Sequence, residues 1–188
     1  MADAVIVSTA RTPIGKAYRG SFNNTEGATL GGLAVSAAIE RAGIEAGEVD
    51  DVVMGAAMQQ GTTGMNVARQ IALRAGCPVT VSGMTMDRQC SSGLMAIATA
   101  SKQVSEDGMP VTIGGGLDSI SLVQNEHMNR HRAVDPALVD MHPAIFMSML
   151  ETAETVADRY GISREDQDAY SLQSQMRTAE AQQAGRYK

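Results

Sequence analysis

The sequence predicts an α/β fold in which helices cover a largely parallel β-sheet. Two observations support this prediction. Of the 188 residues, 44% are apolar and 19% are charged, which is typical of a globular protein with a substantial core. Strand-like and helix-like segments alternate over residues 1–118 in the order βαβαβαβ. Because parallel strands need a crossover between them, this order favours a parallel sheet with helices on its faces.

Four short segments have the composition of strands. Residues 4–9 form a β-branched apolar run and are expected to be a buried strand, with further strands expected at 49–58, 79–86 and 109–117. The last of these contains three glycines at 114–116. They could form a phosphate cradle, but the segment lacks the helix and lysine of a P-loop. Close packing of this strand beside the active site is therefore favoured.

Apolar residues at helical spacing predict three helices between these strands. The first ends near Gly43, the second spans residues 66–75 and the third spans residues 91–106. The faces expected to point inward carry Leu30, Leu33, Ala34, Ala37 and Ala38 in the first helix, Val67, Ile71 and Ala75 in the second, and Leu94, Ile97, Ala98, Ser101 and Val104 in the third. Alanine, glycine and methionine are abundant, so these helices are expected to pack closely.

The character of the chain changes near residue 119. Residues 121–142 are polar and expected to be irregular, and helices are expected at 147–160 and 163–184. Ser163 with an acidic residue three positions later is typical of a helix N-cap. We therefore expect an α/β core over residues 1–118 and part of an inserted helical and loop domain over residues 119–188, above the functional end of the sheet.

Several functional classes are disfavoured. The net charge of −6 argues against nucleic-acid binding. No run of about 18 apolar residues is present, so no membrane span is expected. The first residues lack a basic region typical of a signal peptide, and the two cysteines form no disulfide framework, which favours a reducing cytoplasm. His127, His131 and His142 match no strong ligand spacing, so no metal site is expected.

Cys90 is the strongest candidate for a catalytic residue. It lies where an extended run ends and a helix of small residues begins. The positive end of that helix would favour the thiolate, which is the nucleophilic form of the side chain. The backbone N–H of Cys90 could also point at a tetrahedral oxyanion. The alternative is a buried structural thiol. Cys77, in a helix-to-strand turn, is expected to be structural and not bonded to Cys90.

Residues 87–97, Asp-Arg-Gln-Cys-Ser-Ser-Gly-Leu-Met-Ala-Ile, resemble the nucleophile segment of thiolases, the family of acetyl-CoA acetyltransferases and 3-ketoacyl-CoA thiolases. Further segments resemble that family in the same order, at residues 10–16, 64–70, 114–121, 149–157 and 160–168. The resemblance implies the first half of a thiolase-like layered fold, with a mixed sheet and a truncated inserted domain. Thiolases usually have glutamate at the position of Asp118, glycine at that of Leu150 and, in biosynthetic members, often histidine at that of Ser148. The last difference argues against a simple biosynthetic acetoacetyl-CoA assignment.

The resemblance implies acyl transfer between coenzyme A thioesters through an acyl-cysteine on Cys90, by thiolysis of a 3-ketoacyl-CoA or by condensation of acetyl-CoA, as in fatty acid metabolism. Met149 would line the acyl or pantetheine tunnel, with Ser148 beside it, although a helical methionine often only fills a core. Coenzyme A and acyl-CoA would be substrates, with no permanently bound cofactor. The full-length form would be a homodimer or homotetramer.

Thiolases are about twice as long as this chain, which is expected to end inside the inserted domain. Their later Gly-His-Pro and Cys-x-Gly-Gly-Gly segments, which supply a general base and a second cysteine, do not occur in this sequence. The chain alone is therefore expected to be inactive. Two alternatives stay open: another acyl-cysteine enzyme of the superfamily, such as a ketoacyl synthase or sterol-carrier thiolase, or a non-catalytic fragment or subunit that needs a partner.

Overall fold

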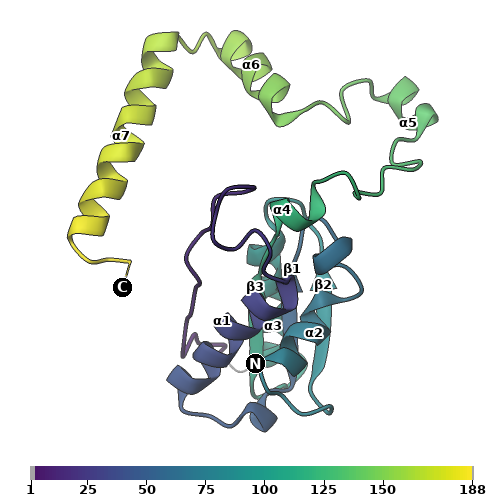
Figure 1. Ribbon diagram of the computed structural model, residues 1–188, viewed down its shortest axis with the longest axis vertical. Helices are drawn as coiled ribbons and strands as arrows, with labels where there is room; N and C mark the ends of the chain where they lie inside the picture. Colours follow the sequence, from purple (N-terminus) through teal and green to yellow (C-terminus); the bar gives the residue numbers. More distant parts are fainter. Residues whose placement is uncertain (1–2, 188) are drawn as a thin grey trace. The chain divides into compact units, whose positions relative to one another are not determined.

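The computed structural model describes residues 3–187, which form two compact units, Met1–Asn129 and Arg130–Lys188 (Figure 1). The first unit extends past the expected end of the α/β core because the following residues contact its N-terminal part. The Tyr18 hydroxyl donates a hydrogen bond to the Gln124 carbonyl at 2.7 Å, and the Tyr18 N–H donates to the Ser121 hydroxyl at 2.8 Å. The assignment of residues 119–188 to an inserted domain stays a prediction.

A three-stranded parallel sheet lies at the centre of the first unit. Its strands are β1 (Asp51–Gly55), β2 (Ser82–Met86) and β3 (Thr112–Gly116), in the spatial order β2-β1-β3. Asp51 lies opposite both Ser82 and Thr112, so the three strands end level with one another. The α/β prediction is confirmed, with three of the expected strands in place. Every strand pair among residues 3–187 is parallel, in contrast to the mixed sheet that the resemblance implied.

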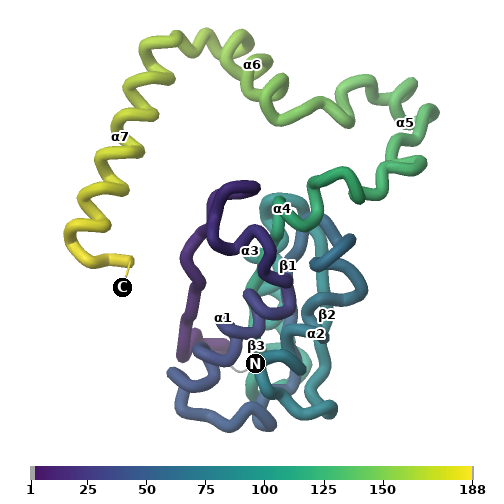
Figure 2. The backbone as a smooth tube through the Cα atoms, viewed as in Figure 1, coloured from purple at the N-terminus to yellow at the C-terminus, as the bar shows by residue number. Residues whose placement is uncertain are grey.

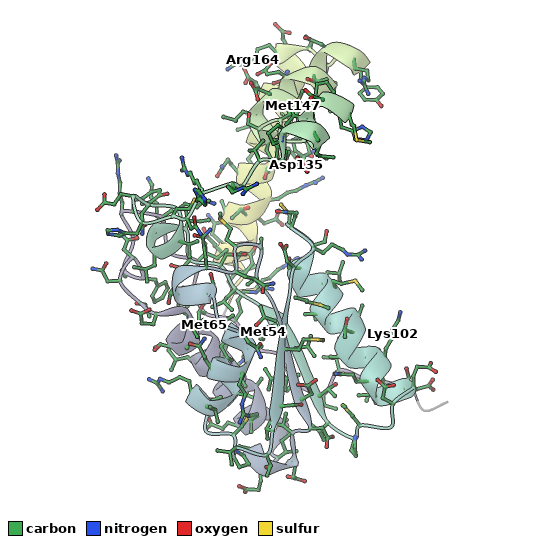
Figure 3. All side chains as sticks on the ribbon, turned by 90° about the vertical axis from the view of Figure 1, so that its right-hand side faces the viewer. Met54, Met65, Lys102, Asp135, Met147 and Arg164 are labelled. Carbon is green, nitrogen blue, oxygen red and sulfur yellow. The ribbon has the colours of Figure 1, made fainter. Side chains whose placement is uncertain are left out.

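Helices cover both faces of this sheet (Figure 3). Side chains alternate between the faces of a strand, so Val52 and Met54 point to one side and Val53 to the other. Val52 and Met54 pack with α1 (Gly27–Ala42) and α2 (Val67–Arg74), whereas Val53 packs with α3 (Ser92–Ser105). Shorter helices complete the unit: η1 (Ala46–Glu48), η2 (Gly61–Thr63) and α4 (Ile120–Val123). The helices expected at 66–75 and 91–106 are thereby confirmed.

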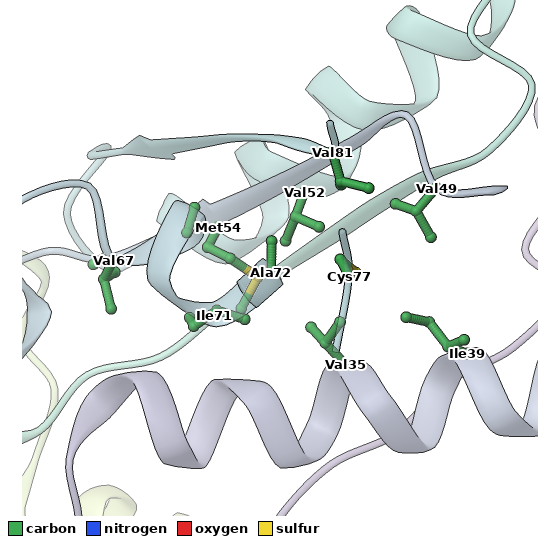
Figure 4. Close-up of a cluster of buried hydrophobic side chains, with 12 residues drawn as sticks. Val35, Ile39, Val49, Val52, Met54, Val67, Ile71, Ala72, Cys77 and Val81 are labelled. Carbon is green, nitrogen blue, oxygen red and sulfur yellow. The ribbon is translucent and has the colours of Figure 1, made fainter. Parts of the chain in front are cut away.

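The main core lies between the sheet and the α1–α2 layer (Figure 4). Ile71 of α2 is fully buried, and α1 approaches it so closely that a Cβ added to Gly31 would lie 2.4 Å from the Ile71 Cδ1 atom. The buried side chains of this cluster are Val35, Ile39, Val49, Val52, Met54, Ala56, Val67, Ala68, Ile71, Ala72, Cys77 and Val81. This core packs against one face of the sheet, and α3 packs against the opposite face.

The prediction of a strand at residues 4–9 is wrong. The segment is extended but pairs with no strand among the described residues, and Figure 2 traces it as a path separate from the sheet. Val5, Ile6 and Val7 are 75%, 79% and 74% exposed. A β-branched composition favours an extended backbone, but a strand also needs a neighbouring edge to bond. One contact to the rest of the unit is the hydrogen bond from the Arg41 guanidinium to the Thr9 carbonyl, at 2.8 Å.

The inward face expected for α1 is partly right, and that expected for α3 is largely wrong. In α1 the buried stripe follows Gly31, Val35 and Ile39. Of the expected residues, Leu33 is 56% exposed, and the others are half-buried: Leu30, Ala34, Ala37 and Ala38. In α3 the buried residues are Ser92, Ala96 and Ala100. Leu94, Ile97, Ala98 and Ser101 are exposed instead, and Val104 is half-buried. The reason is distance: α3 lies so close to the glycines of β3 that only small side chains fit between them. The face expected for α2 is correct, since Val67 and Ile71 are fully buried and Ala75 is half-buried.

The second unit contains α5 (Pro136–Met141), α6 (Met149–Tyr160) and α7 (Arg164–Gln183). The last two helices were expected, whereas α5 lies in a stretch expected to be irregular. None of the three buries a residue. Their ends are instead well capped: Ser163 accepts the Asp166 N–H, as predicted, and Gly161 ends α6 in the left-handed conformation. No helix within residues 3–187 is both long and apolar enough to cross a bilayer.

Candidate active site

The carboxyl ends of the three strands form one edge of the first unit, where parallel α/β sheets commonly bind ligands. The segment that starts at Ala56 follows β1, the turn 87–91 follows β2, and Leu117 and Asp118 follow β3. Gly55, Met86 and Gly116 lie side by side at the end of the ladder. The residues that come directly after these three positions therefore lie close together in space.

Cys90 lies in the turn between β2 and α3, as predicted. Directly before it, Gln89 has a positive φ of 49°, which is uncommon for a residue with a side chain. Two hydrogen bonds hold this conformation. The Gln89 N–H donates to the Asp87 carboxylate at 2.6 Å, and the Gln89 carbonyl accepts the Ser92 N–H at 3.1 Å. The exposed Cys90 side chain is thus presented at the apex of a strained strand-to-helix turn.

Glycines let the first turn of α3 lie directly on the sheet. A Cβ added to Gly55 of β1 would lie only 2.2 Å from the Ser92 carbonyl carbon, and one added to Gly116 would lie 3.1 Å from the Gly93 Cα. A Cβ on Gly114 would lie 2.7 Å from the Ile97 Cα. The prediction that glycines 114–116 serve close packing is therefore confirmed. This packing brings the positive end of α3 to the edge of the sheet where Cys90 lies.

The two cysteines differ as expected. Cys77 is 5% exposed within the main core, and its burial raises the pKa of its thiol, while the charge of Arg69 acts in the opposite direction. Cys90 is exposed, and both thiols are free. The burial of Cys77 agrees with the structural role predicted for it, and the Cys90 thiol is exposed, not buried.

Asp118 lies beside the turn that carries Cys90. Its Oδ2 atom accepts the N–H of Ala57, 3.4 Å away in the segment after β1. Burial of the carboxyl group raises the pKa of Asp118; the backbone N–H groups of Ala57 and Met58 lower it, and the negative charge of Asp87 raises it further. The Asp118 carboxyl group thus interacts with the segments that follow the other two strands, β1 and β2.

The other predicted site residues, Ser148 and Met149, belong to the second unit. Ser148 is the N-cap of α6: its hydroxyl accepts the Glu151 N–H at 3.2 Å, and its own N–H donates to the Glu151 carboxylate at 3.1 Å. The bond from the Ser148 N–H, together with a second donated by the Ser148 hydroxyl at 3.0 Å, lowers the pKa of the Glu151 carboxyl group. Met149 is the first residue of the helix and is 70% exposed. A part in substrate binding stays a prediction for both residues.

The histidines show no sign of a metal centre. His127 lies 3.6 Å from the Glu126 carboxylate, with both side chains exposed. No group of three or more histidine, cysteine, aspartate or glutamate side chains within residues 3–187 could hold a metal ion.

The sequence interpretation missed Asp87 and Ser92, whose side chains bind the turn around Cys90. Ser92 is 3% exposed although serine is usually a surface residue. A signal was available, because serine and aspartate beside a helix start commonly bond backbone N–H groups.

Comparison with known proteins agrees with this architecture. A family model described as "Thiolase, N-terminal domain" matches residues 4–188. The chain belongs to the thiolase family. This thiolase chain is 42% identical over 189 residues to the 3-ketoacyl-CoA thiolase of Bacillus subtilis (strain 168), covering 100% of the chain and 48% of that relative. It is 38% identical over 192 residues to the acetyl-CoA acetyltransferase of Rhizobium meliloti (strain 1021), covering 97% of the chain and 48% of that relative.

A solved acetyl-CoA acetyltransferase has the same fold. The crystal structure of the Bacillus anthracis acetyl-CoA acetyltransferase matches with a TM-score of 0.83 and 33% sequence identity, over 97% of this chain and 48% of that one. The chain therefore spans about half the length of the curated relatives and of the solved structure that it matches.

Proposed function

We propose that this chain supplies the nucleophile of a thiolase that transfers acyl groups between coenzyme A thioesters. The observation that carries the proposal is the placement of Cys90: an exposed thiol on a strained turn, at the carboxyl edge of the sheet and the start of α3. Helix N-termini favour the thiolate, which is the attacking form of cysteine. Membership of the thiolase family supports coenzyme A thioesters as the substrate class.

In thiolysis, the Cys90 thiolate attacks the 3-keto carbon of a 3-ketoacyl-CoA. The bond between C2 and C3 then breaks, and the two-carbon fragment leaves as acetyl-CoA after it takes up a proton. The thiol of a second coenzyme A attacks the acyl-cysteine, so that the shortened acyl-CoA leaves and the Cys90 thiolate is restored. An acyl-cysteine is itself a thioester, so the exchange is nearly balanced in energy and also runs toward condensation.

Other groups contribute to the proposed reaction. The backbone N–H of Cys90 donates to the oxyanion that forms during attack; loss of such a donor typically lowers a rate by about 10²–10³-fold. Ser148 and Met149 contact the substrate, and coenzyme A serves as co-substrate. The enzyme assembles as a homodimer or homotetramer. Turnover requires a general base and a second cysteine from the part of the thiolase fold that this chain does not contain, so the 188-residue chain alone has negligible activity.

The nucleophile can be tested by mass spectrometry on the full-length thiolase. After incubation with acetyl-CoA, we expect an acetyl adduct on the peptide that carries Cys90 and none on the peptide that carries Cys77. The Cys90→Ala variant should lose both the adduct and thiolysis of acetoacetyl-CoA, while Cys77→Ala should retain the adduct. An adduct elsewhere, or full activity of Cys90→Ala, would refute the proposal. Measurable thiolysis by residues 1–188 alone would refute the proposed need for the rest of the fold.

A further inference from the structure

The side chain of Ser92 lies buried beneath the turn that presents Cys90. Its hydroxyl accepts the Arg88 N–H at 2.8 Å and donates to the Gln89 carbonyl at 2.6 Å. The same oxygen lies 3.4 Å from the Asp87 carboxylate. A hydroxyl has one proton to donate and two lone pairs to accept with. The Ser92 hydroxyl therefore interacts with all three residues that separate β2 from Cys90.

This arrangement matters because the turn is strained. A residue other than glycine at positive φ, such as Gln89, persists only where its surroundings hold it. Here the support comes from α3 itself, and the first turn of α3 lies against Gly55 with no space for an added carbon atom. The turn is thus fastened to a helix end that the sheet holds in place.

We propose that Ser92 is a positioning residue for Cys90, whose buried hydroxyl keeps the strained turn in the geometry that acyl transfer requires. This inference rests on the proposed function, since it assigns Ser92 a part in the reaction of Cys90. Removal of the hydroxyl leaves the Arg88 N–H without its acceptor. It also removes one of the two hydrogen bonds that the Gln89 carbonyl accepts, from the Ser92 hydroxyl and the Ser92 N–H. The thiol then samples orientations away from the start of α3.

The primary test compares Ser92→Ala with Ser91→Ala in the full-length thiolase. Ser91 is the adjacent, exposed serine, and its side chain does not cap α3. For Ser92→Ala we expect the rate of Cys90 acetylation by acetyl-CoA and kcat for thiolysis to fall about tenfold or more, with KM for acetoacetyl-CoA within about twofold of the wild-type value. Ser91→Ala should stay within about twofold for all three quantities. A wild-type acetylation rate in Ser92→Ala, or an equal loss in Ser91→Ala, would overturn the inference.

Alkylation with iodoacetamide separates this inference from the proposed function. Without acyl-CoA, Cys90 of Ser92→Ala should be alkylated at least about threefold more slowly, because the turn no longer holds the thiol at the start of α3. Buried Cys77 reports on folding in the same sample and should stay as protected as in the wild type. If wild-type Cys90 forms no acyl adduct, the proposed function fails, while this alkylation rate still decides the role of Ser92. Unchanged or faster alkylation would overturn that role.

A second variant keeps the test decisive if Ser92→Ala does not fold, which exposure of Cys77 would reveal. Asp87→Ala changes an exposed residue and removes the acceptor of the Gln89 N–H. It should slow alkylation and acetylation of Cys90 in the same direction, whereas Asp87→Asn, which keeps an acceptor oxygen, should restore most of the rate. Equal rates in wild type and Asp87→Ala would contradict the inference.

Discussion

The two units of the chain are stabilised in different ways. In the first, strands and helices bury a continuous cluster of apolar side chains, and glycines allow backbones to touch. In the second, α5, α6 and α7 bury no residue, and local hydrogen bonds stabilise the helix ends. One sequence thus forms helices that pack against a sheet in one region and helices with capped ends and no buried residue in another. The proposed nucleophile lies in the packed unit, where its position can be held precisely.

The largest effect is expected from Gly55→Ala. The added carbon would lie 2.2 Å from the backbone of Ser92, and neither β1 nor α3 has a flexible group that could yield. The first unit should lose its cooperative unfolding transition in urea, measured by circular dichroism. Gly93→Ala is the matched control, since its added carbon would approach nothing closer than 3.9 Å. A cooperative transition in Gly55→Ala at the wild-type urea concentration would contradict the close packing described above.

Ile71→Ala should have the next largest effect, because it leaves a cavity in the main core. The side chain is fully buried between α1 and the sheet, so the free energy of unfolding should fall by about 2–5 kcal/mol. Leu73→Ala on the same helix is the control, since Leu73 is 44% exposed and should change this free energy much less. Equal losses in both variants would show that α2 is not held by its buried face.

Ser148→Ala tests the second unit and should act only locally. Loss of the capping hydroxyl should destabilise α6 by about 1 kcal/mol, seen as faster hydrogen exchange at the Glu151 N–H. Exchange in the core strands of the first unit should not change. Ser171→Ala in α7 provides the control, because that hydroxyl bonds a carbonyl within its own helix and not a helix end. If exchange at Glu151 were unchanged, capping would not be what holds α6.

The smallest effect is expected from Asp118→Asn, as a change in pH dependence. Burial raises the pKa of Asp118 in the folded state, so the folded protein binds a proton more readily than the unfolded chain. This contribution to stability is present below the unfolded pKa and is lost as pH rises through the folded pKa. As pH falls through the folded pKa, the wild type should therefore gain stability that Asp118→Asn lacks, measured as the free energy of unfolding in urea at a series of pH values. Asp107→Asn should follow the wild-type profile. Identical profiles for Asp118→Asn and wild type would count against desolvation of the Asp118 carboxyl group.

Local patterns predicted much of the first unit. Three strands, their helices and the junction at Cys90 follow from short-range periodicity and from the change of composition at that residue. The prediction of a strand at residues 4–9 was wrong because strand pairing depends on two segments, and composition describes only one of them. The prediction of the inward face of α3 was wrong for a different reason. Apolarity pointed to Leu94 and Ile97, but the glycine-rich β3 admits a helix so closely that Ala96 and Ala100 face it instead.

The sequence predicted Cys90 as a site residue but not the groups that surround it. Cys90 is recognisable because a thiol at a helix start has a chemical meaning by itself. The roles of Ser92 and Asp118 depend on their hydrogen-bond partners. Ser92 bonds the Arg88 N–H and the Gln89 carbonyl, and Asp118 bonds the Ala57 N–H. Such partners are brought together by the turn and by the level ends of the strands, which periodicity does not encode.

The central place of β1 also has a consequence for how the chain folds during synthesis. Of the described strands β1 is made first, yet both of its edges are filled by later ones, β2 on one side and β3 on the other. During synthesis β1 can therefore pair first with β2 and only later with β3. The seat of α3 on Gly114 and Gly116 forms only after the last of these strands has emerged. The nascent chain thus makes Cys90 well before it makes the strand that fixes the helix behind it.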